Sequence, residues 1–393
     1  MKSMKPQNIL PILFAALALS ACSGRKTGFS AADFTREVYT PAYASGFDIR
    51  GTDSSDATLI TVRDPWQGAR QEVQYLLVLR DGCPLPDGFD GQVVKAPVQR
   101  VVCLSSSHVA MFDALGEVRR IKGVSGIDYI ANPYIREHRL CGEVRDVGYD
   151  SSLDFEALAA MRPSIVLLYG VSGENSMLTG KLRELHIPYI YVGDYLEPSP
   201  LGKAEWLMVA AELCDRSDFG REIFGGIAAR YNALAERVRS HIGSAHPDVV
   251  TLPKVLLNTP YRDTWFMPPA RSYMVRLIRD AGGDTFTVSD EGNASLPVDM
   301  EQAYLLAADA DVWLNVGGCN TLAELRAQNP KFADIPAVRR GQVFNNNRRQ
   351  TFAGGSDFWE SGATHPDLVL HDLAAILHPA LGSDTLVYYK QLR

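Results

Sequence analysis

The sequence predicts an α/β protein with two doubly wound lobes that are joined by one long α-helix, preceded by a small N-terminal β extension. Short apolar strands alternate with helical segments both before and after the middle of the chain, which is typical of parallel sheets covered by helices. In the middle, apolar residues recur every three or four positions from Phe219 to Ile242. A helix of roughly 35 Å is too long for a crossover within one lobe, so we expect it to connect the two lobes.

The first residues form a segment that is typical of an exported lipoprotein. An apolar run over residues 9–19 is too short to span a bilayer and has the layout of a signal peptide. Small residues lead into Cys22, as in bacterial lipoprotein signals, where the chain is cut before a cysteine that becomes lipidated. We expect a signal peptide over 1–21, a lipid anchor on Cys22 and a polar tether over 22–38. The alternative is an ordinary signal peptide cut nearby, which would free the protein from the membrane.

The composition is that of an ordinary globular protein, with 46% hydrophobic and 22% charged residues in a chain of 393. The formal net charge is −7, and removal of Lys2 and Lys5 with the signal leaves −9, which argues against nucleic acid as a partner. The cysteines after Cys22 are odd in number and lack C-x-x-C spacing, which argues against a metal knuckle or a redox pair. One disulfide can form, with its pairing open among Cys83, Cys103, Cys141, Cys214 and Cys319.

Residues 39–94 form the predicted N-terminal extension. Three runs rich in β-branched and aromatic residues, at 42–49, 58–62 and 72–79, are separated by turn signals. We expect a small antiparallel sheet that packs on the first lobe.

The N-lobe is predicted over 95–200, the linker helices over 201–245 and the C-lobe over 246–393. Within the N-lobe, we expect strands at 100–104, 121–123, 165–169 and 189–192, and the clearest helices at 153–161 and 176–185. Within the C-lobe, we expect strands at 254–258, 312–316 and 343–344, and helices at 272–281, 300–308 and 364–377.

The two lobes carry an internal repeat. The segment Asp154-Phe155-Glu156 opens a helix that leads into an apolar strand, and Asp299-Met300-Glu301 does the same about 145 residues later. A repeat of this size indicates two similar domains that face one another across a cleft.

Several short motifs lie in order around the long helix. They are Val101-Val102-Cys103-Leu104-Ser105, Gly123-Val124-Ser125, Leu153-Asp154-Phe155-Glu156, Met161-Arg162-Pro163-Ser164-Ile165-Val166 and Ala281-Gly282-Gly283-Asp284. In their order and spacing the chain, from about residue 95 to its end, resembles the helix-linked (class III) periplasmic substrate-binding proteins of ABC importers for cobalamin, ferric siderophores and haem. Residues 30–94 fall outside this resemblance.

The resemblance implies a monomeric, lipid-anchored receptor on the periplasmic side of a bacterial membrane. Its ligand would be a metal chelate, either an iron complex (siderophore or haem) or cobalamin, and its partner the permease dimer of an ABC importer in the inner membrane. It also implies no enzymatic activity, no resident cofactor and no protein-bound metal ion.

In that family each lobe presents one surface glutamate to an arginine pocket on the permease, and the matching positions are Glu156 and Glu301. A carboxylate accepts both arms of a guanidinium, so two such contacts far apart fix orientation as well as affinity. The alternative is that each glutamate only favours its helix N-terminus.

Ligand contacts are expected where strands end at the cleft, because doubly wound sheets place their sites there. Aromatic side chains would form flat apolar walls for a chelate, and arginines would pair with its anionic groups. The candidate contacts are Tyr149, Tyr169, Tyr261, Arg262, Trp265, Arg271, Arg349 and Trp359.

Two other functions stay open. A receptor for bare zinc or manganese shares the long connecting helix but needs three or four converging His and carboxylate ligands, which the sequence does not clearly supply. An exported α/β enzyme is the other alternative, although the chain lacks a G-x-S-x-G elbow, a P-loop and an H-E-x-x-H motif.

Overall fold

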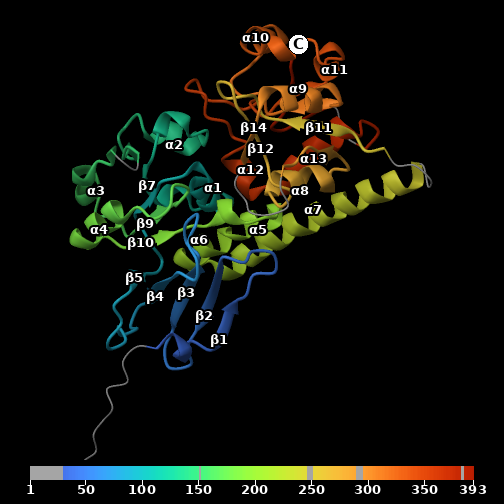
Figure 1. Ribbon diagram of the computed structural model, residues 1–393. Helices are drawn as coiled ribbons and strands as arrows, with labels where there is room; N and C mark the ends of the chain where they lie inside the picture. The colour runs from blue at the N-terminus through green and yellow to red at the C-terminus, as the bar shows by residue number, and fades with distance from the viewer. Residues whose placement is uncertain (1–29, 150–151, 246–250, 289–294, 382–384) are drawn as a thin grey trace, which may run out of the picture.

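The structure, a computed structural model, describes residues 30–149, 152–245, 251–288, 295–381 and 385–393. The expected signal peptide, the lipidation site Cys22 and the first part of the expected tether lie outside these residues. Two α/β lobes stand side by side along one long helix, α7, and a separate sheet lies on the opposite side of that helix (Figure 1). Within the described residues, no helix has both the length and the apolar character needed to cross a bilayer.

The N-terminal extension is a five-stranded sheet in the order β1-β2-β3-β4-β5. Its strands are Arg36–Tyr39, Phe47–Gly51, Ala57–Arg63, Val73–Leu79 and Gln92–Lys95. Strands β2, β3 and β4 are the three antiparallel strands expected from the sequence, whereas β1, which is also antiparallel, and β5, which runs parallel to β4, were not expected. The expected strand at 42–49 begins only at Phe47, because the backbone before it makes a different set of hydrogen bonds.

Two buried glutamates, Glu205 in the linker and Glu197 just before it, bind the backbone of residues 42–46. The carboxylate of Glu205 accepts hydrogen bonds from the Tyr39 hydroxyl (2.7 Å) and from the backbone N–H groups of residues 42, 43 and 44 (2.7–2.8 Å). The carboxylate of Glu197 accepts those of Ser45 and Gly46, together with the indole N–H of Trp206. Glu205 is 0% exposed and Glu197 is 4% exposed, so these charge-assisted bonds attach the extension firmly to the linker region.

The extension also covers the free edge of the N-lobe sheet. Gln74 donates a hydrogen bond to the carbonyl of Tyr189 and accepts one from the N–H of Tyr191, and Gln92 accepts one from the N–H of Tyr189. Side-chain amides thereby replace a neighbouring strand, because an uncovered edge would leave backbone groups unpaired.

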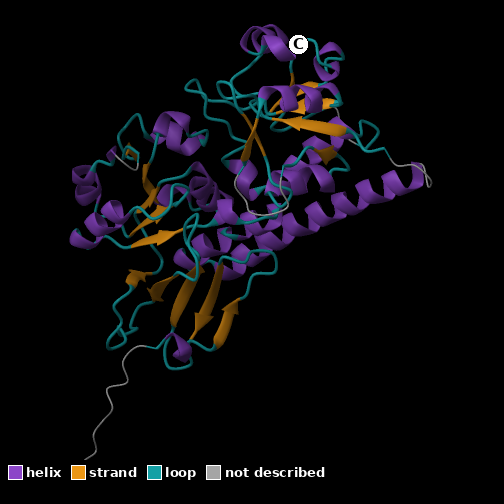
Figure 2. Cartoon of the chain, viewed as in Figure 1, coloured by secondary structure: helices purple, strands orange, loops and turns teal. Residues whose placement is uncertain are grey.

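The N-lobe contains a five-stranded parallel sheet in the order β10-β9-β6-β7-β8. Its strands and helices in chain order are β6 (Val101–Cys103), α1 (Ser106–Ala114), β7 (Ile121–Val124), α2 (Pro133–His138), β8 (Arg145–Asp146), α3 (Phe155–Met161), β9 (Ile165–Leu168), α4 (Ser176–Glu184) and β10 (Tyr189–Tyr191). Figure 2 shows these strands lying between helices.

The linker consists of α5 (Pro200–Glu205), α6 (Leu207–Leu213) and α7 (Ser217–Ala245). Helix α7 is continuous over 29 residues and buries Phe224, Ile227, Tyr231 and Val238 on one face, while the Tyr231 hydroxyl donates to Asp280 at 2.8 Å. The apolar stripe of the sequence is therefore the face that packs against the lobes, and the expected long connecting helix is confirmed.

The C-lobe repeats the design with a sheet in the order β13-β11-β15-β16-β17, parallel except for β17. Its elements are β11 (Lys254–Leu257), β12 (Trp265–Met267), α8 (Tyr273–Asp280), β13 (Asp284–Thr285), β14 (Leu296–Val298), α9 (Met300–Ala308), β15 (Val312–Leu314), α10 (Leu322–Gln328), α11 (Pro336–Arg339), β16 (Val343–Asn345), α12 (Ser361–Thr364), α13 (Pro366–Leu377) and β17 (Lys390–Gln391). Strands β12 and β14 form a separate two-stranded sheet. All five cysteines of the described residues are free thiols.

Candidate ligand-binding site

Two adjoining cavities lie where the N-lobe faces the C-lobe. The lysine cavity, named after Lys203, has a volume of about 300 Å³, and the tyrosine cavity, which contains Tyr129 and Tyr149, has about 310 Å³. Both are lined by Ser105, Ser106, Tyr169 and Trp359, so they form one cleft to which both lobes contribute.

The serines reach the cleft because β6 ends there and α1 begins there. Ser105 has an extended backbone and caps α1 by accepting a hydrogen bond from the N–H of Ser107. Its hydroxyl and that of Ser107 lie 3.0 Å apart. The carboxyl end of a parallel strand and the start of the following helix thus bring hydroxyl groups to the cleft, as doubly wound sheets commonly do.

The tyrosine cavity has aromatic walls from both lobes. Tyr129 and Tyr149 of the N-lobe are 51% and 49% exposed, and Trp359 of the C-lobe is 48% exposed. The lobes touch beside them, because a Cβ atom on Gly355 would lie 1.9 Å from the carbonyl oxygen of Tyr129. Only a glycine allows this approach, which keeps the aromatic side chains of the two lobes close together.

A buried ion pair lies in the lysine cavity. The ammonium group of Lys203 on α5 is 2.6 Å from Oδ2 of Asp194, which follows β10. The Lys203 ammonium also lies 5.6 Å from the ring centroid of Tyr273 on α8. The remaining lining is largely apolar and aromatic, so this pair is the main polar feature of the cavity.

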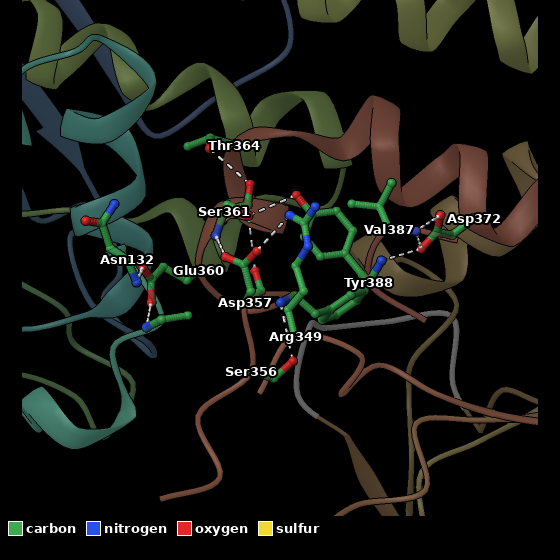
Figure 3. Close-up of polar contacts among 12 residues, drawn as sticks. Asn132, Arg349, Ser356, Asp357, Glu360, Ser361, Thr364, Asp372, Val387 and Tyr388 are labelled. Carbon is green, nitrogen blue, oxygen red and sulfur yellow. Dashed lines mark hydrogen bonds and ion pairs between the residues drawn. The ribbon is translucent and has the colours of Figure 1, made fainter. Parts of the chain in front are cut away.

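A third interlobe cavity, the arginine cavity, lies next to this cleft and has a volume of about 410 Å³. It is lined by Arg136 of the N-lobe and by Arg349, Asp357 and Glu360 of the C-lobe. Arg349 pairs with Asp357 at 3.2 Å, and the Asp357 carboxylate also accepts the N–H of Ser361, as Figure 3 shows.

Glu360 joins the two lobes directly. Its carboxyl oxygens accept hydrogen bonds from the backbone N–H groups of Ala131 (2.7 Å) and Asn132 (2.8 Å), and its side chain points from the C-lobe towards Asn132 in Figure 3. Burial raises the pKa of Glu360 to about 8, opposed by these two N–H groups and reinforced by the negative charges of Asp357 and Asp113. The group is thus largely protonated at neutral pH while the lobes are in contact.

This contact predicts that ligand binding depends on pH. When the lobes separate, water reaches Glu360 and its pKa returns towards the ordinary value of 4.5. The closed arrangement then holds the proton more tightly, so closure is most favourable at low pH and weakens as the pH rises through 4.5 towards about 8. We expect affinity to fall by up to about tenfold per pH unit between these two pKa values and to level off above about pH 8, as measured by calorimetric titration between pH 6 and 9.

The matched variant for this prediction is Glu360→Gln, which cannot titrate. Its affinity should lie below that of the wild type at low pH, because an amide nitrogen cannot accept the second N–H, and it should lose the slope between pH 6 and 8. A wild-type slope in this variant would show that another group is responsible.

Of the eight ligand contacts expected from the sequence, three lie in the cleft, one lies in the neighbouring arginine cavity and four lie elsewhere. Tyr149, Tyr169 and Trp359 come together in the cleft. Arg349 lies in the neighbouring arginine cavity, where its guanidinium is engaged by Asp357 and lies over the ring of Tyr388.

The other four lie elsewhere in the C-lobe. Trp265 is 0% exposed, donates from its indole N–H to the carbonyl of Leu257 and packs against Trp313, so the structure corrects its expected role to that of a core residue. Tyr261, Arg262 and Arg271 are exposed, but none of them lines the lysine or the tyrosine cavity. The guanidinium of Arg262 lies over the Tyr261 ring instead.

The two expected docking glutamates occupy equivalent positions. Asp154 caps α3 and Asp299 caps α9 through the same type of bond to the N–H three residues on, and Glu156 and Glu301 lie exposed in the first turns. In Figure 1, both helices lie on the parts of their lobes that face away from α7. The repeat seen in the sequence is therefore also a repeat in local structure.

Sequence reasoning missed Asp194, Lys203 and Tyr273. Asp194 follows β10, and the end of that strand was a usable signal. Lys203 and Tyr273 belong to helices rather than to strand ends, so no local pattern pointed to them. Among the described residues, no three His, Cys, Asp or Glu side chains gather in a way that could hold a metal ion.

The chain is similar to several known proteins. The model of a family described as periplasmic binding protein matches residues 101–347. Two uncharacterized lipoproteins of Methanocaldococcus jannaschii are 27% and 26% identical over 323 and 322 residues, which cover 78% of this chain in each case and 72% and 77% of the relatives.

Solved structures share its fold. A periplasmic haem-binding protein from Pseudomonas aeruginosa matches with a TM-score of 0.58 at 17% identity, over 75% of this chain and 98% of the other. The periplasmic vitamin B12 binding protein of Vibrio cholerae matches with a TM-score of 0.50 at 13% identity, over 73% and 99%. At these identities the likeness concerns the fold, and the two-lobed α/β architecture expected from the sequence is confirmed.

Proposed function

The chain belongs to the periplasmic binding protein family, and on this premise we propose that it is the lipid-anchored receptor of an ABC importer that captures a metal chelate and delivers it to a permease. The proposed ligand is a ferric siderophore, haem or cobalamin. The observation that carries the proposal is the aromatic cleft to which both lobes contribute, because a ligand held there bridges the lobes.

The chemistry of the cleft supports a flat, partly apolar ligand. Tyr129, Tyr149, Tyr169 and Trp359 offer ring faces and edges against which a planar chelate can stack, and the serine hydroxyls can bind its polar groups. A receptor for bare zinc or manganese would need several His and carboxylate ligands in the same place, whereas the polar side chains of the lining are hydroxyls, the indole of Trp359 and one ion pair.

Other observations support the anchor and the partner. The two relatives from Methanocaldococcus jannaschii are named lipoproteins, in agreement with lipidation of Cys22 and a place outside the cytoplasm. Glu156 and Glu301 supply one exposed carboxylate per lobe for arginines on a permease dimer.

Replacing Cys22 by serine should release the protein from the membrane fraction.

Titration with chelates tests the ligand assignment. Haemin, cobalamin and ferrioxamine are added separately to the purified protein, and binding is followed by quenching of tryptophan fluorescence. We expect saturable binding of at least one chelate, with affinity reduced about tenfold to hundredfold by Tyr149→Ala or Trp359→Ala, because both substitutions remove a ring from the cleft.

A matched control is Tyr304→Ala. Tyr304 on α9 is as exposed as Tyr149, at 49%, but lies outside both cavities, so this variant should bind with wild-type affinity. Failure of all three chelates to bind, or binding that neither cleft substitution alters, would contradict the proposal.

A further inference from the structure

The ion pair between Asp194 and Lys203 has more hydrogen-bonding capacity than their mutual bond uses. Asp194 is 2% exposed, and its Oδ2 accepts a hydrogen bond from Lys203, whereas a carboxylate can accept several. Lys203, whose side chain is 12% exposed, has three N–H donors, of which one binds Asp194. Both residues line the lysine cavity, so a group inside it can reach them.

A buried ion pair gains stability from each further hydrogen bond to its two groups. Removing two charges from water is costly for each ion, and the attraction between them offsets this cost best when their remaining lone pairs and protons are also bonded. A group inside the cavity can therefore stabilise the pair by adding hydrogen bonds to both the carboxylate and the ammonium. Water can supply this in the free protein, and a ligand group can replace the water.

The surroundings of the pair carry no net charge. Asp194 and Lys203 cancel one another, and among the described residues no arginine lines either the lysine or the tyrosine cavity. His108 lies close enough for its charge to be coupled to both members of the pair, but burial lowers its pKa to about 4, so it is neutral at pH 7. The cleft therefore offers one donor and one acceptor side by side without an excess of positive charge.

We propose that Asp194 and Lys203 form the specificity-determining element of the cleft and select ligands that present an uncharged amide. The amide carbonyl accepts a hydrogen bond from Lys203, and the amide N–H donates to Oδ1 of Asp194. A free carboxylate satisfies Lys203 but meets the like charge of Asp194 at close range, which disfavours it in a buried site. This assignment rests on the proposed function, since it concerns the periphery of the chelate rather than its metal.

Pairs of chelates that differ only in their periphery test the assignment. Cobinamide and cobyrinic acid share one corrin ring and carry amides and carboxylates respectively, and haemin bis-amide and haemin form the corresponding porphyrin pair. We expect the wild type to bind the amide member of a pair at least tenfold more tightly than the carboxylate member, as measured by calorimetry or fluorescence quenching.

Two substitutions separate the roles of the pair. Asp194→Asn, which keeps the size of the side chain, should bring the ratio of the two affinities close to one or reverse it, because Lys203 is then free to bind a carboxylate. Lys203→Met should lower affinity for the amide member about tenfold. Thermal unfolding checks that both variants fold, and Lys181→Met, which removes the exposed ion pair of Lys181 with Glu184 on α4, should leave the ratio unchanged.

The outcomes distinguish this assignment from the function on which it rests. Equal or tighter binding of the carboxylate member by the wild type, or a ratio that Asp194→Asn leaves unaltered, overturns the role of the pair while the receptor function stands. If no chelate of either pair and no ferrioxamine binds, the proposed function fails and this assignment fails with it.

Discussion

Replacing both Glu156 and Glu301 by arginine is expected to abolish delivery of the ligand while leaving ligand affinity unchanged. Each carboxylate lies exposed in the first turn of its helix, one on each lobe, and neither lines the cleft. If arginines on the permease bind them, a reversed charge converts two attractions into two repulsions. Uptake of the chelate by cells that carry only the double variant measures the loss.

The single variants should be partly active, because the remaining carboxylate still tethers one lobe to the permease, and the two contacts reinforce one another. The matched control is Glu184→Arg with Glu236→Arg, which reverses two exposed carboxylates on α4 and α7. The control should retain uptake. Normal uptake by the Glu156 and Glu301 double variant would refute the docking assignment, and a loss of ligand affinity would place these residues in a different role.

Replacing Glu205 by glutamine is expected to lower the free energy of unfolding by about 3 to 5 kcal/mol. The carboxylate is fully buried and accepts four hydrogen bonds, two on each oxygen. In the variant an amide nitrogen, which is a donor, faces two of these donors, so buried N–H or O–H groups lose their acceptor. Urea unfolding measures the change.

The structural cause can be checked separately from the stability. Hydrogen exchange of the backbone amides of residues 42–44 should accelerate strongly in Glu205→Gln, because these amides bind that carboxylate directly. Glu236→Gln is the control, since Glu236 pairs with Arg239 at an exposed position and should change stability by less than about 0.5 kcal/mol. Unchanged exchange at residues 42–44 would mean that the extension is attached by other contacts.

The two experiments bear on different parts of the molecule. The double substitution of Glu156 and Glu301 tests the region that matches the family, residues 101–347. Glu205→Gln tests how the N-terminal extension, which lies outside this match, is attached. Because Glu197 and Glu205 belong to the region around α5, the extension is bound beside the same short helix that carries Lys203 into the cleft. Loss of the extension would therefore disturb the position of Lys203 as well as the stability of the fold.

Local patterns in the sequence were sufficient to predict the two lobes and the helix that joins them. The period of the apolar residues from Phe219 to Ile242 predicted the continuous helix α7, because a helix of that length buries one stripe along its whole course. The segments that begin at Asp154 and Asp299, each with a glutamate two positions on, predicted two equivalent helix starts. This local signal is reliable because each aspartate caps its helix by accepting the N–H three residues further along the chain. The motifs around these elements also identified the family correctly.

The cleft depended on residues that are far apart in the chain. Tyr149, Tyr169 and Trp359 were predicted because they follow strands or loops at one edge of the sheets, but Trp265 satisfied the same rule and lies in the core. Whether such a ring faces ligand or core depends on the packing of neighbouring elements, which a residue's near neighbours in sequence do not specify. The contact of Glu360 with Asn132 joins residues 228 positions apart and arises only when the second lobe packs against the first. Asp194 and Lys203 are nine positions apart, and they meet because the chain turns from the end of β10 into α5.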